Sequence, residues 1–165
     1  MEAPLDILIR RAEAEDIANI LPLVQKICDM HRAMDPERYP FVSDVVEQYR
    51  SWMLKRCQDP DSVLLVACAG EAIAGFVVGE ILDEIPVFTL KRYGFLHDLW
   101  VEPEYRRRGI ANRLLRMAIE TLSSRGITQI RGDTAFKNPD ARAMLENIEF
   151  VASTILMVRK SGPES

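Results

Sequence analysis

The sequence predicts a single α/β (α+β) domain, in which about four helices flank a central sheet of six to seven strands. Short runs rich in branched and aromatic residues alternate with longer runs whose apolar residues recur at helical spacing. The length of 165 residues suits one domain that can bury a core. No internal repeat or linker divides the chain, so the predicted domain covers residues 1–165, with 161–165 as a polar tail.

A strand and two helices are predicted in the N-terminal third of the chain. Residues 5–11 carry branched side chains and predict the strand. Residues 14–34 predict a helix with acidic residues in its first turn, and Pro22 should kink this helix or mark its true start. Residues 44–58 predict the second helix, with Ser43 as an imperfect N-cap.

The remaining elements alternate between strands and two helices. Strands are predicted at residues 62–69, 73–82, 95–101, 127–134 and 150–160, and the last of these is either one strand or a pair. Helices are predicted from Gly109, ending before Gly126, and from Asn138. Residues 83–93 form an irregular loop or extend a strand.

The stretch between the central strand and the next helix carries the strongest functional signal. Three arginines, Arg106, Arg107 and Arg108, precede Gly109 at the predicted start of the helix. A helix start has backbone N–H groups without intrahelical acceptors and a positive dipole end. Glycine lets an anion approach these groups closely, and arginine donates hydrogen bonds to phosphate. The combination predicts a phosphate-binding loop.

Two motifs in this sequence resemble those of the GNAT superfamily of N-acetyltransferases. The first is Arg106-x-x-Gly109-x-Ala111, which follows a strand and Pro103 and opens a helix. The second begins at Asn138 and ends at Phe150. The predicted order of strands and helices is also that of the GNAT fold. The resemblance therefore covers essentially the whole chain and implies a mixed, mostly antiparallel sheet that is splayed at its middle.

The resemblance implies acetyl-CoA as cosubstrate and assigns residues to it. In the family, loop amides and arginines grip the pyrophosphate, and the end of the central strand pairs with the pantetheine arm. Carried over to this chain, the residues expected to bind the cofactor are Leu99, Trp100, Val101, Arg106, Arg107, Arg108, Gly109, Ile110, Ala111, Asn112 and Asn138. Asn138 equally suits a helix N-cap, and the two roles can coexist.

Acetyl transfer to an amine needs a base, because an alkyl ammonium with a pKa of roughly 10.4 must lose a proton before it attacks. His97 and Asp98 of the central strand are the candidates, since an acidic pair precedes the matching strand end in polyamine-acetylating relatives. His97 is alternatively a histidine that is hydrogen-bonded within the sheet. Strand alternation places residues 97 and 98 on opposite faces, which would leave Asp98 a structural role. The backbone N–H of Val101 would stabilise the oxyanion.

The acceptor is expected beside the loop between the first two helices, where Tyr39 and Phe41 would form a wall. His31 is expected on the helix surface. The chain departs from the family at Leu145, where many members have the tyrosine that protonates the leaving thiolate, and at Glu149, where they have glycine. The leading hypothesis is direct acetyl transfer to a small amine. The alternatives are an acyl-CoA sensor with little activity and a protein or peptide N-acetyltransferase.

Charge and composition limit which other binding partners the protein is expected to have. The net charge of −4 leaves the arginine cluster as a local positive spot, which favours a small anion over nucleic acid. No apolar run is long enough for a membrane span, and no cluster has metal-ligand spacing. Three cysteines without CxxC pairing and an acidic N-terminus without an apolar leader predict a soluble protein of the reducing cytoplasm. A homodimer is an expectation at the level of the family alone.

Overall fold

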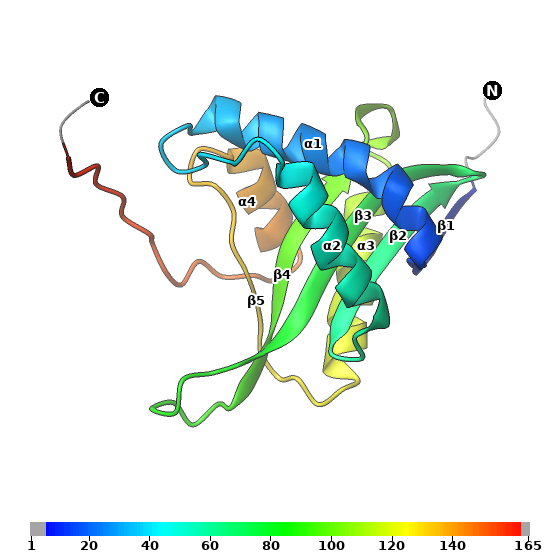
Figure 1. Ribbon diagram of the computed structural model, residues 1–165. Helices are drawn as coiled ribbons and strands as arrows, with labels where there is room; N and C mark the ends of the chain where they lie inside the picture. The colour runs from blue at the N-terminus through cyan, green and yellow to red at the C-terminus, as the bar shows by residue number, and fades with distance from the viewer. Residues whose placement is uncertain (1–5, 163–165) are drawn as a thin grey trace.

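A five-stranded sheet forms the centre of the molecule in the computed structural model, which describes residues 6–162 (Figure 1). The strands lie in the order β1-β2-β3-β4-β5. Neighbours pair antiparallel, except that β4 and β5 are parallel. Their bounds are Ile7–Arg11 (β1), Ser62–Ala69 (β2), Ala72–Asp83 (β3), Arg92–Val101 (β4) and Ile130–Gly132 (β5). The sheet is therefore mixed and mostly antiparallel, as the family resemblance implies.

Helices cover both faces of this sheet. One buried cluster joins α1 and α2 to one face, and a second joins α3 and α4 to the other. The α-helices are α1 (Ile17–Met34), α2 (Val45–Gln58), α3 (Ile110–Ser123) and α4 (Pro139–Glu146). Short 3₁₀ turns at Ala14–Asp16 and Pro103–Tyr105 precede α1 and α3. This layered arrangement confirms the predicted α/β class with four helices.

Local predictions differ from the structure at three element starts. Pro22 lies inside α1 and does not mark its start, which is at Ile17. Ser43 is not the N-cap of α2, because Asp44 occupies that position, without a side-chain cap bond. Strand β4 begins at Arg92 rather than Phe95, because Arg92 pairs with Asp83 and the two strands continue as a long hairpin.

The prediction of six to seven strands was wrong for the C-terminal part of the chain. Residues 151–162 contain no strand, although 150–160 predicted one or two. Strand β5 spans three residues rather than the eight expected at 127–134. The backbone N–H and C=O groups of a strand need a neighbouring strand as hydrogen-bond partner. Among the described residues, no strand pairs with residues 151–162. Leu5 of the predicted first strand lies outside the described residues.

A β-bulge interrupts the pairing of β4 with β3. Val78 pairs with Asp98 while Gly79 pairs with Leu96, so His97 has no residue opposite it. Gly79 fits this irregularity, because a Cβ there would lie 2.7 Å from the carbonyl oxygen of Phe95. A bulge adds one residue to one strand and thereby resets which face the following side chains occupy.

Strand β4 has a neighbour on both sides only at its beginning. Its parallel pairing with β5 covers Gly94 to Leu96, whereas its antiparallel pairing with β3 continues to Val101. The edge of residues 97–101 that faces away from β3 is therefore unpaired within the described chain. This is the splayed sheet that the resemblance implies.

The end of α4 places Glu149 in an unfavourable backbone conformation. Its φ is +72°, in the left-handed region that favours glycine. Phe150 N–H donates to the carbonyl of Leu145, and Glu149 N–H donates to that of Glu146. These two bonds form a Schellman motif, in which the residue at the position of Glu149 is usually glycine. The motif accounts for the glycine that the resembled family pattern has at this position.

Replacing Glu149 with glycine should therefore stabilise the protein by about 1 kcal/mol, since it removes left-handed strain that exceeds the entropic cost of glycine. Urea unfolding measures the change. The matched control is Glu146→Gly, the same substitution within α4, which should destabilise by roughly 0.5–1 kcal/mol. Equal destabilisation by both variants would contradict the account of this helix end.

Candidate active site

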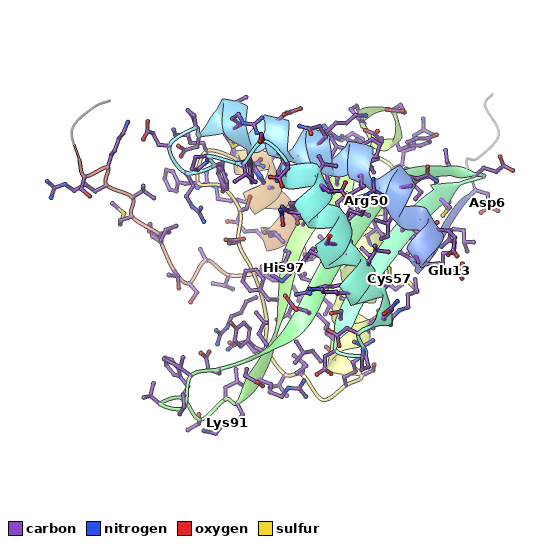
Figure 2. All side chains as sticks on the ribbon, in the orientation of Figure 1. Asp6, Glu13, Arg50, Cys57, Lys91 and His97 are labelled. Atoms are coloured by element: carbon purple, nitrogen blue, oxygen red, sulfur yellow. The ribbon has the colours of Figure 1, made fainter. Side chains whose placement is uncertain are left out.

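A cavity of about 320 Å³ lies where β4 and β5 diverge. Its lining comes from α1, the α1–α2 loop, α2, the middle of β4, the segment after β5, and α4. His97 and Asp98 both line it, and Figure 2 labels His97 on β4 beside α2. The cavity therefore opens along the unpaired part of β4.

His97 and Asp98 face the same side of the sheet, contrary to the expectation from strand alternation. The His97 ring packs edge-on against Trp52 of α2, with centroids 5.2 Å apart. The Asp98 carboxylate accepts a hydrogen bond of 3.0 Å from the hydroxyl of Tyr49, also of α2. The bulge at His97 is the cause, because it breaks the alternation between these two residues. Both side chains can thus act in one cavity.

His97 is held by a carboxylate of the neighbouring strand. Its Nε2 lies 2.8 Å from Oε1 of Glu80 on β3. The other oxygen of Glu80 accepts a 2.5 Å hydrogen bond from Arg56, so both oxygens of this carboxylate have a partner. An ionised carboxylate only accepts hydrogen bonds, so Nε2 carries the hydrogen and Nδ1 of a neutral ring keeps its lone pair. His97 can therefore be hydrogen-bonded within the sheet and still act as the base.

Asp98 lies in an environment that disfavours its charge. Burial raises the pKa of Asp98, and the hydrogen bond from Tyr49 opposes this effect in part. Burial, followed by the nearby Asp98 carboxylate, raises the pKa of Tyr49, so the hydroxyl keeps its proton and remains the donor. A buried carboxylate at a cavity wall is stabilised when a cation enters.

An aromatic stack also lines the cavity. Tyr39 stacks on His31 with centroids 4.6 Å apart and on Phe41 with centroids 6.0 Å apart, and all three residues line the cavity. His31 is thus half-buried in the cavity lining rather than on the open helix surface where it was expected, and burial lowers its pKa. Arg38 and Asp133 add one charge of each sign to the lining.

The predicted phosphate loop has the backbone that anion binding needs. Gly109 precedes α3 with φ +75°, and Arg107 also has a positive φ of 62°. A Cβ built on Gly109 meets nothing within 4 Å, so open space lies in front of the helix start. Arg107 and Arg108 are exposed, whereas the side chain of Ile110 is buried in the core. The first-turn N–H groups, including those of Ala111 and the exposed Asn112, lie at this helix start.

Arg106 has a different position from the other two arginines. Its Nε donates a 2.7 Å hydrogen bond to the carbonyl of Val101, and its guanidinium lies 4.7 Å from the centre of the Trp100 ring. All three arginines are exposed, but Arg106 ties the loop to the end of β4.

Backbone directions at the end of β4 distinguish the three residues expected to pair with pantetheine. Glu102 N–H donates to the carbonyl of Ala74 on β3, and backbone groups of successive residues face opposite edges. Val101 and Leu99 consequently direct their N–H and C=O groups to the unpaired edge, whereas those of Trp100 face β3. The N–H of Val101, the residue expected to stabilise the oxyanion, thus points to the unpaired edge.

The second motif lies next to the same cavity. Asn138 caps α4 by accepting a 3.1 Å hydrogen bond from Ala141 N–H, and it also lines the cavity with Leu145. Leucine has no proton to donate, so the tyrosine role is vacant at this position.

Within residues 6–162, no group of three metal-binding side chains is present, and no helix is long and apolar enough to span a bilayer.

Sequence reasoning missed Glu80 and Tyr49, which hold the two candidate catalytic residues. Tyr49 was covered only by the predicted helix at residues 44–58, and Glu80 only by the predicted strand at residues 73–82. The partners are 49 and 17 residues apart along the chain. The charged Glu80 beside Gly79 in a buried strand was the available signal.

Comparisons with known proteins agree with this geometry. The model of the acetyltransferase (GNAT) family matches residues 24–150. An uncharacterized N-acetyltransferase of Archaeoglobus fulgidus is 33% identical over 112 residues, which are 68% of this chain and 71% of that protein. The thialysine N-epsilon-acetyltransferase of Bos taurus is 25% identical over 126 residues, which are 76% of this chain and 72% of that protein.

A solved structure supports the fold. The crystal structure of a protein described as a predicted acetyltransferase, with acetyl-CoA, from Clostridium acetobutylicum superposes with a TM-score of 0.76. The sequences are 18% identical, and the match covers 94% of this chain and 96% of that one. At this identity the likeness concerns the fold.

Proposed function

The chain belongs to the acetyltransferase (GNAT) family, and on this premise we propose that it transfers an acetyl group from acetyl-CoA directly to the amine of a small molecule. The family makes it an N-acetyltransferase with acetyl-CoA as cosubstrate. One observation carries the finer proposal: His97 and Asp98 line a single cavity beside the unpaired edge of β4.

The residues present fit the coenzyme. The helix start at Gly109 offers N–H groups in open space, with Arg107 and Arg108 exposed beside it. The edge at Leu99 and Val101 offers backbone groups for an amide-containing chain. Acetyl-CoA supplies an acyl group that is activated as a thioester. The chain's own residues hold it, orient it and provide the proton path.

In the proposed reaction, Nδ1 of His97 takes the proton that the attacking amine gives up. Glu80 then stabilises the imidazolium through Nε2. The C–N bond forms first and gives a tetrahedral oxyanion, which the Val101 N–H stabilises, and the C–S bond then breaks with loss of the thiolate. The leaving thiolate takes its proton from solvent, because Leu145 has none to give.

The acceptor is a small cationic amine in this proposal. A cavity of about 320 Å³ is at the lower end of small-molecule sites. Asp98 and Asp133 attract the ammonium form, and Tyr39 and Phe41 offer aromatic faces to it. All three cysteines are unpaired thiols, so the proposal places the enzyme in the reducing cytoplasm.

An acceptor screen tests this proposal against the sensor alternative, which the missing tyrosine at Leu145 keeps open. The protein is incubated with acetyl-CoA and a panel of diamines, polyamines, basic amino acids and peptides with free amines, and release of free thiol is followed. Turnover with at least one small amine, faster than with any peptide, is expected. Tight binding of acetyl-CoA without turnover on the whole panel would favour the sensor.

Removing the Tyr49 hydroxyl should change the titration of Asp98. Its hydrogen bond lowers the pKa of Asp98, so Tyr49→Phe should raise this pKa further and keep the carboxyl neutral to a higher pH. The carboxyl ¹³C shift of Asp98 measures the change. The KM for the amine should also begin to rise at a higher pH on acidification, because the neutral acid no longer attracts an ammonium. An unchanged titration would contradict the assigned contact.

A further inference from the structure

A charged residue is buried just before the arginines of the predicted phosphate loop, residues 106–109, here called the arginine loop. Glu102 comes directly after β4 and is 9% exposed. Its N–H donates to the carbonyl of Ala74, and its carbonyl accepts from the N–H of Tyr105, so its backbone is fixed on both sides. A buried carboxylate is costly unless it is paired, so the partners of Glu102 decide how it affects the loop.

Two side chains donate hydrogen bonds to the Glu102 carboxylate. Nζ of Lys26 on α1 donates to Oε1 over 2.5 Å, and the indole N–H of Trp100 donates to Oε2 over 3.1 Å. Burial opposes the charge of Glu102, but these two hydrogen bonds outweigh it and lower its pKa, so the carboxylate is ionised at neutral pH. A lysine of α1 thus neutralises an anion at the end of β4.

Arg106 of the arginine loop is a second cation near this carboxylate. Its charge acts on Glu102, and its guanidinium lies 4.7 Å from the centre of the Trp100 ring, whose N–H binds Glu102. The ion pair of Glu102 is nevertheless made with Lys26, while Nε of Arg106 donates to the Val101 carbonyl. Within residues 6–162 this is the one hydrogen bond of the Arg106 side chain, so its terminal nitrogens remain available to a phosphate.

We propose that Lys26 is a positioning residue of the acetyl-CoA site: by neutralising Glu102, it leaves Arg106 in the arginine loop to bind the pyrophosphate. Without Lys26, the buried carboxylate would draw the guanidinium of Arg106 away from Val101 and from the phosphate. The inference rests on the proposed function, in which the arginine loop binds acetyl-CoA. It extends the site to a helix that neither sequence motif includes.

Lys26 acts from outside the reaction cavity. Ile27, the next residue of α1, lines the cavity, whereas Lys26 pairs with Glu102. Replacing Lys26 should therefore leave His97 and the position of the amine unchanged. We expect the KM for acetyl-CoA to rise while kcat at saturation changes little, which a general loss of structure would not produce.

Replacing Lys26 with methionine tests the proposal, since methionine keeps the helix propensity of lysine but removes the charge. The affinity for acetyl-CoA, measured by calorimetry, should fall by about 10-fold or more, the usual effect of losing a charge-assisted hydrogen bond. Lys26→Arg should keep the affinity, because a guanidinium can still pair with Glu102. The matched control is Lys55→Met on α2, which replaces an exposed helix lysine without an ion pair in the described part of the chain and should bind acetyl-CoA normally.

A second substitution distinguishes the charge of Glu102 from its structural contacts. Glu102→Gln removes the charge and keeps an oxygen that can accept from Trp100. Combined with Lys26→Met, it should restore the affinity for acetyl-CoA to near that of the unmodified protein. On its own, Glu102→Gln should bind acetyl-CoA at least as tightly as the unmodified protein, because no anion then competes with the phosphate for Arg106.

The variants separate this inference from the proposed function. Unchanged affinity of Lys26→Met, or weak binding that Glu102→Gln does not restore, would overturn the role of Lys26. If Lys26→Met does not fold, Glu102→Gln decides alone, and weaker binding of acetyl-CoA by this variant would overturn the inference. If the unmodified protein does not bind acetyl-CoA, or if Gly109→Val binds it equally, the proposed function fails and this inference fails with it. Loss of binding in Gly109→Val with normal binding in Lys26→Met would overturn this inference alone.

Discussion

Replacing His97 with glutamine is expected to lower turnover by about 10²- to 10⁴-fold, the usual contribution of a general base. Glutamine can still donate a hydrogen bond to Glu80, so the support beneath the residue is kept while the titratable ring is lost. Affinity for acetyl-CoA should change little, since the coenzyme contacts are assigned to Gly109 and the end of β4. Steady-state rates together with calorimetric binding of acetyl-CoA measure the two effects separately.

The matched control for this variant is His31→Gln. His31 is the other histidine of the chain and lines the same cavity, but it stacks on Tyr39 and has no carboxylate bound to its ring in the structure described for residues 6–162. The His31→Gln variant should alter the KM for the amine more than turnover. If His97→Gln keeps the turnover of the unmodified enzyme, the base lies elsewhere, and Asp98 becomes the next residue to replace.

Replacing Gly109 with valine is expected to weaken acetyl-CoA binding by at least about 100-fold. The new side chain would project into the open space before α3, where the phosphate should sit. Losing two charge-assisted hydrogen bonds there costs about 3 kcal/mol, which corresponds to this factor. Calorimetric titration of the variant with acetyl-CoA measures the loss.

Gly126→Val is the control for backbone strain. Gly126 has φ +81° and, like Gly109, nothing within 4 Å of an added Cβ, but it lies beyond the opposite end of α3. Both substitutions should destabilise the fold by about 1–2 kcal/mol or more, because valine is forced into the left-handed region. Only Gly109→Val should lose acetyl-CoA. Equal affinities of the two variants for acetyl-CoA would show that this loop is not part of the coenzyme site.

Local patterns in the sequence were sufficient for much of the fold. The apolar spacing after Gly109 predicted α3, and β2 lies at residues 62–69 as expected. Asn138 caps its helix as its side chain suggested. These features depend on neighbours a few residues away, so the sequence carries them directly.

Features that depend on distant partners could not be predicted in the same way. The bulge at His97 arises from the register of β4 with β3. It places residues 97 and 98 on the same face of the sheet instead of on opposite faces. The contacts of Glu80 and Tyr49 with them are likewise set by the assembled sheet and α2. The predicted last strand failed for a related reason, since a strand without a neighbour has no ladder to join.

The central claim is that the helix start at Gly109 and the open edge of β4 bind acetyl-CoA. Titration of dialysed protein with acetyl-CoA by calorimetry, with coenzyme A and ATP as controls, tests it most directly. Binding at micromolar concentrations, with ATP much weaker, is the predicted result. No binding of acetyl-CoA would show that residues 106–111 form only a basic turn, and the enzymatic account of this cavity would be contradicted.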